Sequence, residues 1–198
     1  AHDHRPLLNL VADKVKVREI VADKIGDKYL IPLIGVVRSV EELRKISLPR
    51  EFVAKPTHAS GGSLVVWDGV VRNFFPSQKI RYRWERFFVK PEDFDLSTFE
   101  IISSRWLKQS YFRNPGEFPE YAYKNIQPGI IIEELLQFNS NIPNDFRFFM
   151  FDGKCEFITV DSLGENGVER NVYSKDWEKL PVTLKYPNFD KTYPKPIA

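Results

Sequence analysis

The chain has 198 residues, of which 42% are hydrophobic and 28% charged, and its formal net charge is +2. This composition is typical of a soluble globular protein and excludes wholesale disorder, while so small a net charge gives no sign by itself of nucleic-acid binding. A single cysteine, Cys155, excludes an intrachain disulfide and a cysteine-rich metal site. No apolar run approaches the roughly 18 residues of a membrane helix, so we expect no transmembrane segment.

The first fifty residues predict two helices separated by an apolar stretch. Apolar residues recur on one face over residues 13–25, where Asp13 can cap the start of a helix and Gly26 can end it. The capping box at residues 39–42 predicts a short helix that continues through residue 46. The apolar residues 29–37 between them are interrupted by a proline.

The middle of the chain alternates apolar segments with turns. We expect strands over residues 51–55, 63–67 and 129–136. Another capping box, beginning at Ser97, predicts a helix to about Tyr111. Residues 72–90 are basic and aromatic and match no single pattern.

The last third predicts a small sheet. Two apolar segments, 145–151 and 155–160, flank Asp152-Gly153, which is a strong signal for a two-residue hairpin turn. Residues 169–173 predict another strand, and the tail beyond residue 181 predicts loop. The fold class that follows is α+β, with antiparallel sheets and helices in two lobes that meet near residues 136–144.

Lys55 and the small residues after it have the chemistry of a phosphate site. Lys55 ends an apolar strand, and Ser60, Gly61 and Gly62 allow backbone N–H groups to approach an anion closely. His58 lies in the same loop. An ordinary strand and turn with a surface lysine explains this segment equally well, and the ending Gly-Lys-Ser/Thr of a P-loop is absent.

Three other groups of polar residues interrupt apolar strands. Glu133 would need a partner such as an adenine amino group or a lysine, unless it faces water at a sheet edge. Arg147 either pairs with Asp145 on the same strand face or binds phosphate while Asp145 binds ribose. Arg170 and Asn171 suit a terminal phosphate, and Asp161 is a weak candidate for a metal ligand, although each is more often a surface or turn residue.

In this order, these segments resemble the TupA-like family of the ATP-grasp superfamily, whose members are linked to teichuronopeptide and other bacterial cell-surface polysaccharides. The resemblance spans nearly the whole chain. The matching stretches are Ala12-Asp13-Lys14, Val17-Arg18-Glu19, Tyr29-Leu30-Ile31-Pro32-Leu33, Phe52-Val53-Ala54-Lys55, His58-Ala59-Ser60-Gly61-Gly62, Tyr123-Lys124-Asn125-Ile126, Ile131-Ile132-Glu133, Asp145-Phe146-Arg147-Phe148-Phe149, Phe151-Asp152-Gly153-Lys154, Val160-Asp161-Ser162, Arg170-Asn171 and Asp176-Trp177.

The resemblance implies a role for each of these residues around a nucleotide cleft. Lys14 and Lys55 would contact the phosphates of ATP, Ser60-Gly61-Gly62 would cover them, and Glu133 with the backbone near Leu135 would bind adenine. Asp145 would also belong to the nucleotide site, and Arg147, Arg170 and Asn171 would act in catalysis. The implied cofactors are ATP and Mg²⁺, and the implied activity is a carboxylate–amine or similar ligase that forms an acyl phosphate.

The same resemblance implies the organisation and setting of the protein. We expect an N-terminal helical segment (1–48), a first lobe with the phosphate loop and hinge strand (49–136) and an incomplete second lobe (137–198). Gly129 stands where the family pattern has an arginine, and the family's usual magnesium ligands would lie beyond residue 198, so we expect both ends to be cut. The implied substrates are a glycan, an amino acid or a peptide, in the bacterial cytoplasm.

Three alternatives remain open at this level. Members of the family are often labelled glycosyltransferases, an enzyme class that usually places a carboxylate pair near a metal on a doubly wound fold. The cations and aromatics of residues 79–86 suit a single-stranded nucleic acid, although a solvated surface is the better interpretation and no nucleic acid is expected. The third alternative is a non-catalytic remnant that binds nucleotide weakly or not at all.

Overall fold

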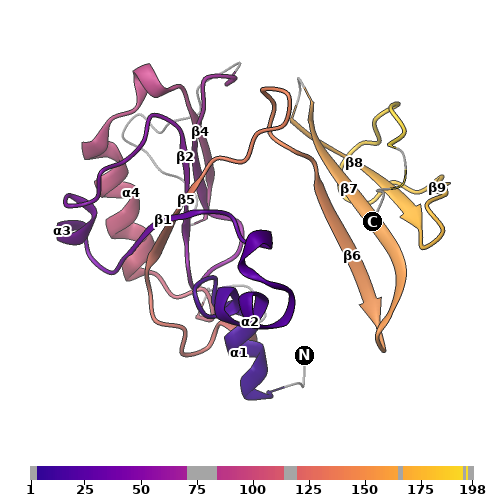
Figure 1. The fold of residues 1–198 in the computed structure, drawn as a ribbon, viewed down its shortest axis with the longest axis horizontal. Coiled ribbons are helices and arrows are strands. Elements are labelled where there is room, and N and C mark those ends of the chain that lie inside the picture. The colour runs from indigo at the N-terminus through magenta and orange to yellow at the C-terminus, as the bar shows by residue number, and fades with distance from the viewer. Residues whose placement is uncertain (1–3, 71–83, 114–119, 165–166, 194, 196–198) are drawn as a thin grey trace. The chain divides into compact units, whose positions relative to one another are not determined.

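A computed structural model describes residues 4–70, 84–113, 120–164, 167–193 and 195. The chain forms two compact units, residues 1–135 and 136–198, each with its own sheet (Figure 1). Residues 72–83, which include positions 79–83 of the basic segment considered for nucleic acid, lie outside the described residues. No described helix is long and apolar enough to cross a membrane.

The first unit is built on a five-stranded sheet with the order β1-β5-β2-β3-β4. Its strands are β1 (Leu33–Val37), β2 (Phe52–Pro56), β3 (Ser63–Val66), β4 (Arg86–Val89) and β5 (Ile130–Glu134). All neighbours are antiparallel except β3 and β4, which are parallel, so the expectation of purely antiparallel sheets is wrong at this edge. The long connection between β3 and β4 allows this arrangement, since parallel neighbours need a crossover of a dozen or more residues.

The helix predicted over residues 13–25 corresponds to α2 (Lys16–Ile25), and it is preceded by a helix that the sequence did not predict, α1 (Pro6–Ala12). Asp13 lies between them, where its Oδ1 accepts hydrogen bonds from the backbone N–H groups of Val15 at 2.9 Å and Lys16 at 3.4 Å. The aspartate therefore satisfies the first donors of α2 from outside the helix. Gly26, with φ of +99°, ends α2 as predicted.

The helices predicted from the two capping boxes are present, but their predicted bounds were only partly correct. Ser39 accepts a hydrogen bond from Glu42 N at 3.1 Å, but the helix it caps, α3 (Val40–Leu43), is shorter than expected. The helix α4 (Leu96–Lys108) begins one residue before the predicted cap, because Asp95 accepts from the N–H groups of Ser97 and Thr98. A carboxylate satisfies two orphan donors of α4, whereas the Ser97 hydroxyl donates to Asp95 instead.

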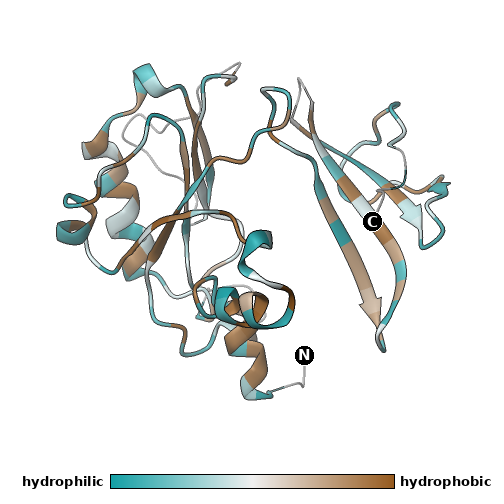
Figure 2. Ribbon diagram, viewed as in Figure 1, coloured by the Kyte–Doolittle hydropathy of each residue, from teal (hydrophilic) through white to brown (hydrophobic). Residues whose placement is uncertain are grey.

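The core of the first unit lies between α4 and the sheet. Phe99, Ile102 and Trp106 on one face of α4 are buried against apolar side chains of the strands. Figure 2 shows hydrophobic stretches, in brown, beside more hydrophilic ones along α4. Three short 3-10 helices complete the unit: η1 (Asp27–Tyr29), η2 (Pro91–Asp93) and η3 (Tyr121–Tyr123).

The second unit is a four-stranded antiparallel sheet with the order β6-β7-β8-β9. Its strands are β6 (Asp145–Phe151), β7 (Lys154–Gly164), β8 (Gly167–Ser174) and β9 (Lys179–Leu180). The hairpin predicted at Asp152-Gly153 is confirmed, and both residues have positive φ, as a two-residue turn of this kind requires. The described part of this unit contains strands and loops without a helix.

Candidate functional site

Lys55 and Glu133 form an ion pair between neighbouring strands of the first unit. The register of β2 and β5 places Val53 opposite Glu133, and Lys55 lies on the same face of β2 as Val53. The Lys55 Nζ donates to Glu133 Oε2 at 3.0 Å. Glu133 is only 7% exposed, so its charge is tolerated in the apolar strand because it has cationic partners.

Arg18 is the second partner of Glu133, and our sequence analysis did not assign it to the site. Its Nη1 donates to Glu133 Oε1 at 2.8 Å, and its Nη2 donates to Ile31 O at 2.6 Å. A carboxylate within an apolar strand signals that a cation must lie nearby. The sequence contains no indication that this cation comes from α2, 115 residues away.

Lys14 lies beside this pair and is held by the loop that follows β2. Its Nζ donates to the backbone carbonyls of Pro56, at 2.9 Å, and of Ala59. Burial, and next the positive charge of Lys55, lower the pKa of Lys14 to about 8. Two neighbouring ammonium groups, one of them largely desolvated, favour an anion as the third partner.

The loop after β2 requires glycine at two successive positions. Gly61 has φ of +94°, which other residues rarely adopt, and a Cβ on Gly62 would lie 3.2 Å from Pro56 Cγ. Ser60 and Gly61 are exposed. Within the described parts of the chain, the backbone N–H groups of Ser60, Gly61 and Gly62 have no hydrogen-bond acceptor, so they remain able to donate to an anion.

His58 holds the base of the same loop against the end of α4. Its Nε2 lies 3.0 Å from Trp106 O and 3.1 Å from Gln109 O, and the residue is 3% exposed. Burial lowers the pKa of His58, so the imidazole is neutral near pH 7 and donates from Nε2. Its position is that of a structural residue and not of a phosphate ligand.

Leu135 follows β5 directly and is half-buried. The structure thus brings Lys14, Lys55 and Glu133 into one cluster and places residues 60–62 in the loop whose carbonyls hold Lys14. These predicted residues, together with Leu135, all belong to the first unit. The remaining four, Asp145, Arg147, Arg170 and Asn171, belong to the second unit.

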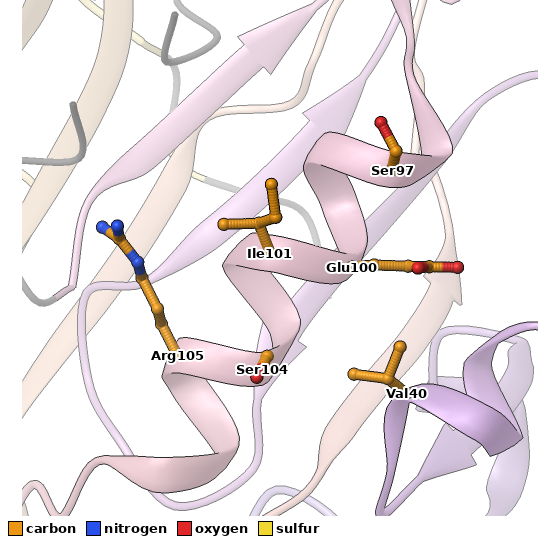
Figure 3. Close-up of a pocket in the computed structure, with 6 residues that line it drawn as sticks. All are labelled: Val40, Ser97, Glu100, Ile101, Ser104 and Arg105. Carbon is orange, nitrogen blue, oxygen red and sulfur yellow. The ribbon is translucent and has the colours of Figure 1, made fainter. Parts of the chain in front are cut away.

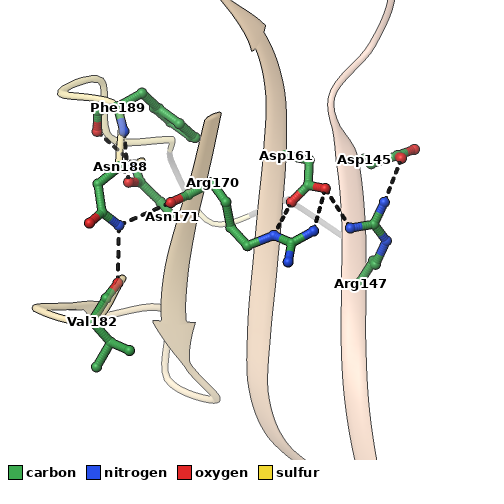
Figure 4. Close-up of polar contacts among 8 residues, drawn as sticks. All are labelled: Asp145, Arg147, Asp161, Arg170, Asn171, Val182, Asn188 and Phe189. Carbon is green, nitrogen blue, oxygen red and sulfur yellow. Dashed lines mark hydrogen bonds and ion pairs between the residues drawn. The ribbon is translucent and has the colours of Figure 1, made fainter. Parts of the chain in front are cut away.

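In the second unit, Asp161 joins two arginines from the strands on either side of it (Figure 4). Arg170 donates to both carboxylate oxygens, from Nε at 2.5 Å and from Nη2 at 2.7 Å, and Arg147 Nη1 donates to Oδ2. Arg147 Nη2 also donates to Asp145 Oδ2 at 3.1 Å. The internal salt bridge, which was the alternative to a phosphate-binding Arg147, is therefore present.

Asn171 is fully buried and its amide is used within the fold. Its Nδ2 donates to Phe189 O at 3.0 Å and to Lys191 O at 3.2 Å, and its Oδ1 accepts from Phe189 N at 3.2 Å. The side chain fastens the segment after β9 to β8. These contacts give the buried amide of Asn171 a structural role.

Comparison with known families identifies the family of the chain. A model of the family TupA-like ATPgrasp matches residues 2–197, which is nearly the whole chain. The chain belongs to the TupA-like ATP-grasp family. No curated protein and no solved structure matches it. The family assignment implies nucleotide binding, and ATP-grasp enzymes generally use ATP and Mg²⁺.

The described residues of this TupA-like chain suit the phosphates of ATP better than they suit a magnesium ion. Lys14, Lys55 and the loop at residues 60–62 offer charge and N–H donors, which suits the phosphates of ATP. For magnesium, the described residues contain no group of three His, Cys, Asp or Glu side chains that could hold a metal ion. Asp161 already accepts from two guanidinium groups, which argues against its use as a magnesium ligand.

A separate open groove of about 510 Å³ runs along α4 and contains none of the predicted site residues (Figure 3). Glu100, on its rim, pairs with Arg44 through bonds of 2.8 and 2.7 Å. This exposed ion pair leaves the groove with little unsatisfied charge. The predicted nucleotide-binding residues of the first unit therefore lie outside this groove.

Proposed function

We propose that this TupA-like ATP-grasp chain binds the phosphates of ATP with Lys14, Lys55 and the loop at residues 60–62. The observation that carries the proposal is the position of Lys14, whose amine is desolvated beside Lys55 and held by carbonyls of that loop. Lys14, Lys55 and Arg18 contribute three positive charges, and the carboxylates of Glu133 and Asp13, which both act on Lys14, contribute two negative charges. The cluster therefore has a net charge of about +1, which favours a polyphosphate as a further partner.

Arg18 makes it possible for Lys55 to change partners. When phosphate is absent, Lys55 Nζ donates to one oxygen of Glu133 while Arg18 donates to the other. When Lys55 turns toward phosphate, Arg18 still neutralises the buried carboxylate, so the exchange leaves no unpaired charge. Lys14 and the N–H groups of residues 60–62 would complete the phosphate contacts.

Glu133 then has a role different from the adenine contact that the family resemblance implies. Both of its oxygens have cationic partners, and it controls the position of Lys55. We assign the adenine edge to the backbone that follows β5, at Leu135. Binding of the terminal phosphate by Arg147, Arg170 and Asn171 and of ribose by Asp145 remains a prediction.

The reaction we propose is ATP-dependent joining of a carboxylate to an amine or similar nucleophile. The carboxylate attacks the γ-phosphorus, the bond to the β–γ bridging oxygen breaks, and an acyl phosphate and ADP form. The amine then attacks the acyl carbon, loses a proton and displaces inorganic phosphate. The support for this chemistry is membership of the ATP-grasp family, and the family's link to cell-surface polysaccharides supports a glycan, amino acid or peptide substrate in a bacterial cytoplasm.

Calorimetric titration with ATP and Mg²⁺ tests the nucleotide site. Lys55→Ala should weaken ATP binding at least tenfold, because it removes a phosphate-binding charge and leaves Glu133 still paired with Arg18. Lys45→Ala is the matched control, since Lys45 is exposed in the same unit. Equal ATP affinity for the two variants would contradict the proposed site, and stabilisation by a UDP-sugar but not by ATP would favour a glycosyltransferase.

A further inference from the structure

The amine of Lys14 uses two bonding positions on the protein and keeps one free. Its Nζ donates to the backbone carbonyl oxygens of Pro56, at 2.9 Å, and of Ala59, and it has no third acceptor among the described residues. A neutral amine has two N–H groups and one lone pair, so these two carbonyls satisfy both of its donors and leave the lone pair unused. The arrangement therefore suits a neutral amine that acts as a nucleophile.

Charged groups on several elements set the protonation of this amine. Burial lowers the pKa of Lys14 most, and the charge of Lys55 lowers it further. Asp13 and Glu133 raise it, and the result is about 8. His58, in the loop that holds the amine, is neutral near pH 7 because burial lowers its pKa. About a quarter of the Lys14 amines are thus neutral at pH 7.5, compared with about one in a thousand for an amine at the ordinary value of 10.5.

Groups that can bind a phosphate lie around the same amine. The side chain of Lys55 is 30% exposed, so its ammonium can reach a ligand. The loop whose carbonyl at Ala59 holds Lys14 continues into residues 60–62, and their N–H groups have no acceptor in the parts of the chain that the structure describes. A molecule bound here through a phosphate would place its adjoining atoms close to the Lys14 nitrogen.

We propose that Lys14 is a site of covalent modification by small acyl phosphates, such as acetyl phosphate. These molecules combine a phosphate with an electrophilic acyl carbon, and the two groups share one bridging oxygen. The Lys14 lone pair attacks the acyl carbon, and the bond from that carbon to the bridging oxygen breaks. Phosphate leaves with the electron pair and takes up the proton that the amine loses. The products are an amide on Lys14 and hydrogen phosphate, and nothing is oxidised or reduced.

This modification would turn off the phosphate site. An amide at Lys14 carries no charge, so the net charge of about +1 in the cluster falls to about zero. A free acyl phosphate would therefore lower the affinity for ATP, which is a form of regulation separate from the ligase reaction. The effect on ATP rests on the proposed function, whereas the modification itself needs only the amine, Lys55 and the loop.

Mass spectrometry of the protein treated with acetyl phosphate at pH 7.5, without nucleotide, tests the modification. Lys14 should be acetylated at least tenfold faster than Lys45, which is exposed in the same unit and is the internal control. The expected factor is smaller than the ratio of neutral amines, because an amine of lower pKa is also a weaker nucleophile. The rate at Lys14 should level off near pH 9, where its amine is mostly neutral. Equal rates at the two lysines would overturn the proposal.

Lys55→Ala tests whether the phosphate of the reagent is recognised. The variant should slow the reaction of Lys14 with acetyl phosphate at least fivefold more than its reaction with acetic anhydride. Both reagents need the neutral amine, but only acetyl phosphate carries a phosphate that Lys55 can bind. Lys24→Ala, at an exposed position of α2, is the control and should change neither rate. Equal slowing of the two reactions by Lys55→Ala would overturn the recognition of the phosphate.

Calorimetry of the acetylated protein tests the effect on ATP. When Lys14 is mostly acetylated and Lys45 is not, ATP should bind at least tenfold more weakly than after mock treatment with acetate and phosphate. Rapid acetylation of Lys14 with unchanged ATP affinity would support the modification and contradict the proposed nucleotide site. Slow acetylation with normal ATP affinity would overturn the modification and leave the nucleotide site in place.

Discussion

Arg18 Nη1 lies 2.8 Å from Glu133 Oε1 across 115 residues of sequence, and this bond connects α2 to β5, which lies between β1 and β2 in the sheet. The side chains of the two residues are 16% and 9% exposed, so the pair is largely shielded from water. Lys55 takes the other oxygen of Glu133. The carboxylate is therefore the common partner of Arg18 and Lys55. In the proposed site, Arg18 stays paired with it while Lys55 turns to phosphate.

Replacing Arg18 by methionine should lower both stability and ATP affinity. The free energy of unfolding should fall by about 1–3 kcal/mol, because a buried charged group loses one of its two partners. ATP affinity should fall because Glu133 then holds Lys55 as its sole cationic partner. Urea unfolding and calorimetry measure the two effects.

The control for Arg18→Met is Arg44→Met. Arg44 also pairs with a glutamate, Glu100, but its side chain is 57% exposed, so we expect a loss below about 1 kcal/mol and unchanged ATP affinity. If both variants lost the same stability and bound ATP alike, Arg18 would have no special role at Glu133.

ATP binding should be accompanied by proton uptake near pH 8.5. The pKa of Lys14 is about 8 in the absence of phosphate, so most of its amines are neutral at that pH. Phosphate beside the amine raises the pKa, and roughly three-quarters of a proton should be taken up per ATP. Titrations in buffers of different ionisation enthalpy measure this number, which should be near zero at pH 6.5 and should vanish in Lys14→Met. The same uptake at both pH values would contradict the assignment to Lys14.

The stability of the empty protein should also depend on Lys14. Its pKa is about 8 when folded and 10.5 in the reference state, so folding releases a proton between these values. The unfolded state binds more protons in this window, and the free energy of unfolding therefore rises with pH from about 8 to 10.5. The rise due to Lys14 is at most about 3 kcal/mol. Urea unfolding at several pH values should show a steeper rise for the wild type than for Lys14→Met, and parallel curves would exclude this contribution.

The phosphate loop should be sensitive to a methyl group at Gly61. Gly61→Ala strains a residue with φ of +94°, which costs about 1 kcal/mol, and should weaken ATP binding because the N–H donors of the loop change direction. Gly26→Ala is a closely matched control, since Gly26 has φ of +99° and open space around it. Both variants should lose similar stability, and only Gly61→Ala should lose affinity for ATP. Unchanged affinity would show that this loop does not contact the nucleotide.

The sequence predicted those elements whose signals are local. The turn at Asp152-Gly153 and the strands on either side of it follow from two adjacent residues and from the apolar segments that flank them. The start of α4 was misplaced because Asp95 and Ser97 are both good caps, and only the folded backbone decides between them. The parallel edge of β3 and β4 depends on a crossover, which local patterns do not specify.

The candidate site was predictable where one segment supplies several groups. Lys55 and residues 60–62 belong to one strand and its loop, and a buried Glu133 signalled a nearby cation. Arg18 could not be predicted, because its contact depends on how α2 packs on the sheet. The pairing of Arg147 with Asp145 was foreseen as an alternative, whereas the central place of Asp161 between two arginines depends on strand register.

Replacing Asp161 by asparagine tests whether the arginine network stabilises the second unit. Burial alone would raise the pKa of Asp161, but hydrogen bonds from Arg170 and Arg147 outweigh it and hold the pKa below its usual value. The carboxylate thus contributes stability above about pH 4 that is lost as the pH falls through its lowered pKa. At pH 7, Asp161→Asn should lower the free energy of unfolding by about 2–4 kcal/mol, because two guanidinium groups lose their shared partner.

The control is Asp176→Asn. The side chain of Asp176 is 73% exposed, so this change should cost less than about 0.5 kcal/mol. Equal losses for the two variants at pH 7 would show that the charge of Asp161 is not what holds the three strands together.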